Sequence, residues 1–128
     1  MEVFTLENTF SQNSLTSYVV PKYVETRGFI YILQDKAFPE FFKIGRTADM
    51  LKRLAEYNSD KPYPSTYLTH ISKCFADVIS VEKKILEYLY KTTSPTAFKL
   101  EWFEIAQLPL AIQLLEDAED YFPLYTIV

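Results

Sequence analysis

The sequence has little of several residue types on which small proteins often depend. Two glycines in 128 residues leave little room for flexible linkers, and the single cysteine, Cys74, cannot form a disulfide within the chain. With only one histidine, no Cys and His spacing indicates a zinc site. No stretch approaches the roughly 20 apolar residues that span a membrane, and the N-terminus lacks a basic segment followed by an apolar core. We therefore expect an intracellular chain without a membrane anchor, located in the cytoplasm or inside a host cell, including its nucleoid or nucleus.

The cations are concentrated in the middle of the chain. Hydrophobic residues make up 48% of the sequence and aromatic residues 16%, which predicts a single globular domain. The net charge of −4 divides into −1 for residues 1–27, +3 for residues 28–99 and −6 for residues 100–128. The overall balance argues against a general polyanion binder, so we expect any phosphate site in the middle segment.

The hydrophobic periodicity predicts the order β-β-α-β-α-β-α. This order is typical of an α+β fold, here a small mixed sheet with an N-terminal β-hairpin and three helices. The expected strands are residues 28–33, 41–47, 66–75 and 100–106, and the expected helices are residues 48–58, residues 78–91 after an Asp77 N-cap, and one opening at Pro109. We divide the chain into an N-terminal arm (1–27), a main domain (28–106), and a C-terminal helix with an apolar tail packed on it (107–128).

The first two expected strands form a hairpin with a rather long turn. If that turn centres on Ala37, Tyr31 pairs with Lys43 and Gly45 pairs with Phe29. Tyr31 and Lys43 then share one face of the sheet. Gly45 is open to two interpretations, a β-bulge or a close approach of a ligand to the backbone.

Glu82 occupies an unusual position on the second expected helix. At 100° per residue it falls in the middle of the apolar stripe, whereas the neighbouring lysines take the opposite side. A buried carboxylate needs an arginine, a metal ion or a set of hydrogen-bond donors, so both a structural ion pair and a functional site remain open. On the first helix Arg53 and Tyr57 lie one turn apart and are neighbours on its surface.

Several segments in order resemble a known family. The chain resembles the GIY-YIG nuclease superfamily in an ordered set of segments. These are GFIY, FKIGRT, the helical residues Arg53 and Tyr57, Glu82 on a later helix, and EWF. The likeness is greatest to its phage and large-DNA-virus branch, in which KIG replaces YIG and which is described as DNA-binding or nuclease-like.

This resemblance implies phosphodiester hydrolysis with one divalent metal ion, Mg²⁺ or Mn²⁺. In such a site Tyr31 helps to activate water, Arg53 holds the scissile phosphate and Glu82 binds the metal. Lys43 and Tyr57 complete the expected catalytic set.

We expect three further residues to contact nucleic acid. They are Gly45, Arg46 and Lys52.

The sequence departs from the family pattern at two places. Lys43 stands where YIG has its tyrosine, and we expect its ammonium to neutralise a phosphate or to lower the pKa of Tyr31. No asparagine follows Glu82, and Glu101 either replaces it or caps a strand. Trp102 and Phe103 are expected in the core.

The sequence therefore predicts a metal-dependent endonuclease that acts on DNA or another nucleic acid. One alternative is a catalytically inactive DNA-binding module that keeps the cleft. Another is a protein-interaction factor whose acidic, apolar C-terminus contacts a protein partner or a second copy of the chain.

Overall fold

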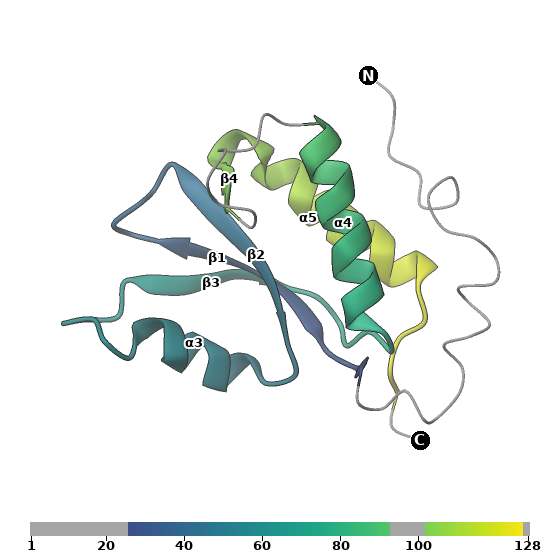
Figure 1. Ribbon diagram of the computed structural model, residues 1–128, viewed down its shortest axis with the longest axis horizontal. Coiled ribbons are helices and arrows are strands. Elements are labelled where there is room, and N and C mark those ends of the chain that lie inside the picture. Colours follow the sequence, from purple (N-terminus) through teal and green to yellow (C-terminus); the bar gives the residue numbers. More distant parts are fainter. Residues whose placement is uncertain (1–25, 93–101, 127–128) are drawn as a thin grey trace.

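Four antiparallel strands form a single sheet in the order β3-β1-β2-β4 (Figure 1). This computed structural model describes residues 26–92 and 102–126, so most of the expected N-terminal arm, and Glu101, lie outside the described residues. The α+β fold with an N-terminal hairpin and three helices is confirmed, but all strand pairs among the described residues are antiparallel, so the sheet is not mixed. The strands are β1 (Phe29–Asp35), β2 (Phe41–Thr47), β3 (Thr66–Ile71) and β4 (Trp102–Glu104).

The three helices match the predicted ones closely. They are α3 (Met50–Asn58), α4 (Val78–Thr92) and α5 (Leu108–Tyr121), and the 3₁₀ turn η2 (Ile105–Gln107) joins β4 to α5. Asp77 caps α4 as predicted, because its Oδ1 accepts a hydrogen bond from Ser80 N at 3.2 Å. Within the described part of the chain, none of the helices combines the length and the apolar character needed to cross a membrane.

The hairpin register differs from the predicted one by two residues. Tyr31 pairs with Gly45, and Lys43 pairs with Leu33 instead of Tyr31. The turn centres on Phe38, since β1 continues to Asp35 and the Asp35 carbonyl accepts a hydrogen bond from Phe38 N at 2.9 Å. A shift by two residues preserves the alternation of side chains, so Tyr31 and Lys43 still share a face, as predicted.

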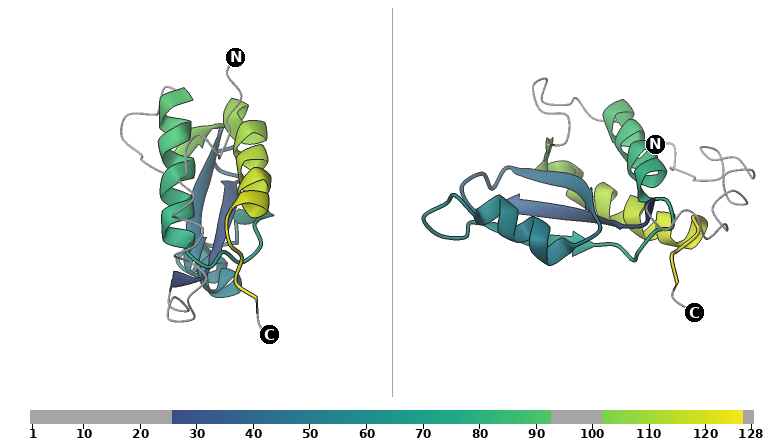
Figure 2. Two further views of the ribbon diagram at one scale, coloured as in Figure 1. Left: turned by 90° about the vertical axis from the view of Figure 1, so that its right-hand side faces the viewer. Right: turned by 60° about the horizontal axis from the view of Figure 1, so that its bottom comes forward.

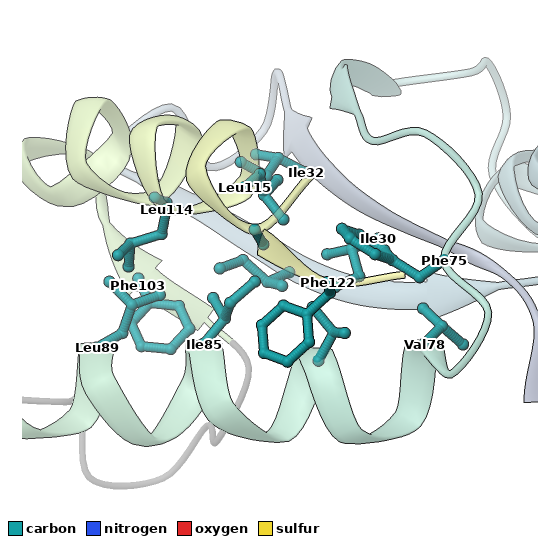
Figure 3. Close-up of a cluster of buried hydrophobic side chains, with 14 of the residues drawn as sticks. Ile30, Ile32, Phe75, Val78, Ile85, Leu89, Phe103, Leu114, Leu115 and Phe122 are labelled. Carbon is teal, nitrogen blue, oxygen red and sulfur yellow. The ribbon is translucent and has the colours of Figure 1, made fainter. Parts of the chain in front are cut away.

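The helices lie on opposite faces of the sheet. α4 and α5 run side by side over one face and α3 covers the other (Figures 1 and 2). Side chains of α4 point toward the sheet and α5, among them Val78, Ile85 and Leu89 (Figure 3). The main core therefore lies between the sheet and these two helices, and burial of its apolar side chains is the dominant stabilising contribution. Its sheet residues are Ile30, Ile32, Phe42, Ile44 and Phe103.

α3 is attached more lightly, because it contains no buried residue. The amide of Asn58 at its C-terminal end exchanges two hydrogen bonds with the Thr66 backbone, at 3.0 and 3.1 Å. The loop that follows α3 is held by Lys61, whose Nζ lies 2.7 Å from Asp35 Oδ2. Polar contacts thus position α3 over the sheet, in contrast to the apolar packing of α4.

Candidate functional site

The outer edge of β2 is open along its second half. β4 pairs with β2 only from Phe41 to Lys43, and no other described strand pairs with residues 44–47 on that side. α3 follows β2 on one face of the sheet, and α4 crosses the other. Side chains from both helices therefore approach the same open edge.

A cleft of about 260 Å³ lies at this edge. It joins groups from both faces of the sheet because no neighbouring strand separates them there. The cleft is lined by Tyr31, Gly45, Arg46, Arg53, Tyr57 and Glu82. Four of the five expected catalytic residues and two of the three expected nucleic-acid contacts are thus brought together.

Tyr31 and Tyr57 connect β1 to α3 inside the cleft. Their hydroxyl oxygens are 3.2 Å apart, within hydrogen-bonding distance, and their rings meet edge to face with centroids 6.3 Å apart. Tyr57 and Arg53 are one turn apart on α3, whose start is capped by Asp49 through a 3.1 Å hydrogen bond from Lys52 N. The cap and the tyrosine pair together fix which face of α3 is directed at the cleft.

Gly45 is required by Tyr31. A Cβ on Gly45 would overlap the hydroxyl oxygen and Cζ of Tyr31 and would lie 2.9 Å from its Cε1. Tyr31 is 1% exposed, so its ring has little room to move aside. The small residue in β2 therefore accommodates the tyrosine ring across the strand pair.

Burial raises the pKa of Tyr31 well above its usual value. The hydrogen bond to Tyr57 adds to this rise, and the nearby Arg53 guanidinium only partly opposes it. The net shift is therefore opposite in direction to the lowering expected from Lys43. Tyr31 holds its proton throughout the physiological pH range.

Glu82 is buried in α4, as its position in the apolar stripe predicts. It is 3% exposed, and its Oε1 accepts a hydrogen bond from Arg46 Nη1 at 2.6 Å. Oε2 is also buried and accepts no hydrogen bond from the described residues. Of the partners that a buried carboxylate can have, the structure supplies an arginine, and this arginine lies within the cleft.

Two expected residues do not line the cleft. Lys43 lies nearby, with its Nζ 5.9 Å from the Tyr57 ring centroid and 5.8 Å from that of Trp102, distances typical of cation–π contacts. Lys52 is exposed on α3. Phe103 is buried as expected, but Trp102 is only half-buried. The Trp102 ring lies next to Lys43 beside the cleft.

The pairing of Arg46 with Glu82 was not predicted from the sequence. Strand alternation was the available signal, because it places Arg46 on the face of β2 opposite to Lys43 and hence toward α4. Because the two residues are 36 positions apart in the sequence, no local pattern can indicate that they pair.

The arrangement combines a carboxylate, two guanidinium groups and two phenols. Guanidinium groups bind phosphate oxygens, and phenols donate hydrogen bonds to water or phosphate. No group of three or more His, Cys, Asp or Glu side chains suitable for a metal ion occurs in residues 26–92 and 102–126. Among the described residues that line the cleft, Glu82 is the one that carries a carboxylate.

Comparison with known proteins places the chain in a family. Residues 28–121 match the T5orf172 domain, and the chain belongs to this family. The T5orf172 domain is a phage-associated, nuclease-related domain, which suggests a role related to nucleic acid. No curated protein and no solved structure gives a significant match.

Proposed function

We propose that this T5orf172 domain binds nucleic acid at the open edge of β2 and hydrolyses a phosphodiester there, in the manner of the KIG branch of the GIY-YIG nucleases. One observation carries the proposal. Tyr31, Arg53, Tyr57 and Glu82 come from β1, α3 and α4 and line a single cleft.

Arg53 is the group proposed to bind the scissile phosphate. Its side chain is 41% exposed, and its Nε lies 3.1 Å from Oε1 of Glu56 on the same helix. An exposed ion pair of this kind contributes little to stability, so Arg53 can exchange it for a phosphate at low cost. A guanidinium offers paired donors that match two phosphate oxygens.

Tyr31 is proposed to orient the attacking water. Because its pKa is raised, its hydroxyl acts as a hydrogen-bonding phenol and not as a phenolate base. The hydroxyl group of Tyr57, on α3, lies within hydrogen-bonding distance of the Tyr31 hydroxyl and fixes its position. The proton released by water must therefore pass to a group other than Tyr31, such as a phosphate oxygen or solvent.

Glu82 is proposed as the protein ligand of a magnesium ion. Mg²⁺ in proteins is commonly held by one or two carboxylates, with phosphate oxygens and water completing its shell, and Glu82 provides one such carboxylate. When bound, the ion would polarise the phosphate and stabilise the charge that develops on it.

A plasmid-nicking assay in Mg²⁺, Mn²⁺ or EDTA tests this function. Glu82→Gln and Arg53→Gln are compared with Glu87→Gln and Lys36→Gln, which remove the same charges from exposed positions of α4 and of the turn between β1 and β2. We expect metal-dependent nicking in the wild type and in both control variants, and none in Glu82→Gln or Arg53→Gln. Nicking by Glu82→Gln at the wild-type rate would contradict the assignment.

The bond between Arg46 and Glu82 favours one second candidate, a nucleic-acid-binding module without turnover. In that case the carboxylate serves the fold and the cleft binds phosphate through Arg53 alone. Salt-sensitive DNA binding without nicking in either metal would select this module. Absence of both would leave the nucleic-acid proposal without support.

A further inference from the structure

Arg46 and Glu82 form an unequal pair across the cleft. Arg46 extends from the open edge of β2 and its side chain is 47% exposed, whereas the Glu82 side chain is 4% exposed. Both residues line the cleft. One partner is therefore fixed in the core and the other can reach solvent or a ligand.

The ion pair conflicts with the use of either residue on a ligand. While Arg46 Nη1 lies 2.6 Å from Glu82 Oε1, that oxygen already has a cation, and the positive guanidinium repels any divalent ion brought to the carboxylate. The same bond directs a donor of Arg46 at Glu82 and away from an incoming phosphate. Separation of the pair leaves Arg46 ready for an anion and Glu82 ready for a cation.

We propose that Arg46 exchanges Glu82 for a phosphate of the bound nucleic acid, and that this exchange couples phosphate binding to divalent-cation binding at Glu82. Arg46 is thus a positioning residue, and the inference rests on the proposed function of the cleft. Coupling of this kind is reciprocal, so each ligand strengthens the binding of the other. In the absence of both ligands, the pair holds the cleft in a resting state.

The first test measures DNA binding in EDTA, where no metal contributes. A fluorescein-labelled DNA duplex is titrated with the wild type, Glu82→Gln, Arg46→Gln and the double variant, and the change in anisotropy gives each Kd. Because Glu82→Gln releases Arg46, we expect it to bind about 5-fold more tightly than the wild type or better, as typical coupling energies imply.

Two controls separate this effect from a change in net charge. Glu87→Gln removes the same charge from an exposed position of α4 and should bind within about twofold of the wild type. The double variant should bind no more tightly than Arg46→Gln, and it removes both charges of the ion pair, so neither is left without the other. An equal gain from Glu82→Gln with and without Arg46, or no gain at all, would overturn the exchange.

The second test measures Mn²⁺ binding without DNA, by electron paramagnetic resonance. We expect Arg46→Gln to bind Mn²⁺ at least about 5-fold more tightly than the wild type, Lys84→Gln to match the wild type, and Glu82→Gln to lose the site. Lys84→Gln is the matched control because it removes one cation from α4 outside the cleft. If Arg46→Gln does not fold, Arg46→Lys replaces it, with a smaller gain expected because a point charge loses the forked donor geometry.

The outcomes distinguish the exchange from the proposed function. Equal Mn²⁺ affinity in the wild type and Arg46→Gln, with the site lost in Glu82→Gln, would overturn the exchange and leave the metal site intact. Mn²⁺ binding that is the same in Glu82→Gln as in the wild type would overturn both the metal assignment and the coupling.

Discussion

The Tyr31 ring lies against Gly45, its direct partner across β1 and β2. This contact links the small residue of the KIG segment to the phenol of the GFIY segment. The register of β1 and β2 brings the two segments into contact, whatever their spacing along the chain.

Substitution of Gly45 should therefore act through Tyr31. We expect Gly45→Ala to cost about 1–3 kcal/mol, since overpacking at a buried site forces the ring from its position. The added cost should largely vanish in a Tyr31→Ala background, where no ring meets the new methyl group. Urea denaturation of the four proteins measures this double-mutant cycle, and additive effects would show that the ring is not the cause.

The buried phenol of Tyr31 should make the protein sensitive to alkali. Its pKa is raised in the folded state, so above about pH 10 the unfolded chain loses a proton that the folded protein keeps. Stability should then fall as the pH rises. We expect a shallower fall in Tyr31→Phe, measured by thermal unfolding between pH 9 and pH 11.

Tyr63→Phe is the control for that measurement, because Tyr63 is 70% exposed. It should follow the wild-type curve. Identical slopes for Tyr31→Phe and the wild type would contradict the assigned pKa direction.

Removal of Arg46 and removal of Glu82 should lower the stability of the fold by different amounts. Arg46→Gln leaves a buried carboxylate without its 2.6 Å partner, whereas Glu82→Gln leaves a guanidinium that water already reaches. We expect a larger decrease in Tm for Arg46→Gln than for Glu82→Gln, with both measured in EDTA by differential scanning calorimetry. The reverse order would mean that the carboxylate is not the costly partner.

Asp35 should stabilise the fold above acidic pH. Burial opposes its ionisation, but hydrogen bonds from Lys61 at 2.7 Å and Ala37 N at 2.9 Å outweigh this effect and lower the pKa of Asp35 to about 2. The contribution is complete above the unfolded pKa near 4 and is lost as the pH falls toward 2.

Asp35→Asn should therefore lower the free energy of unfolding by about 1–2 kcal/mol at pH 7 and flatten its decline between pH 4 and pH 2. Asp60→Asn, at an exposed position of the loop that follows α3 and carries Lys61, should leave both unchanged. Denaturant titrations at several pH values make the comparison. An acid profile of Asp35→Asn that parallels the wild type would exclude this role.

Nucleic-acid binding should depend on salt through the cations of the cleft. We expect Arg53→Gln to weaken binding and to reduce the slope of log K against log salt by about one phosphate contact. Lys36→Gln, on the exposed turn between β1 and β2, should keep the wild-type slope. An unchanged slope in Arg53→Gln would place the phosphate contact elsewhere.

Local patterns predicted most of the fold. The helical position of Glu82 was enough to predict its burial, and the Asp77 cap was enough to locate the start of α4. The turn of the hairpin was misplaced because Asp35 extends β1 and accepts a hydrogen bond from Ala37 N, a choice that the flanking apolar runs do not reveal.

The site was predictable only in part, since its contacts depend on how the elements pack. Arg46 meets Glu82 because α4 crosses the face of β2 near its open end, and no local spacing reports that crossing. Lys43 was expected beside Tyr31, yet it lies between the Tyr57 and Trp102 rings, since β4 brings Trp102 alongside it.

The light attachment of α3 bears on how such domains diverge. Glu82 is set in α4, where substitutions disturb the main core, whereas α3 buries none of its residues and presents Leu51, at 82% exposure, to solvent. Surface substitutions of this kind usually change stability by less than about 0.5 kcal/mol. Outward positions of α3 should therefore accept substitutions at little cost to the fold, so contacts made by this helix can change while the core around α4 and Glu82 stays intact.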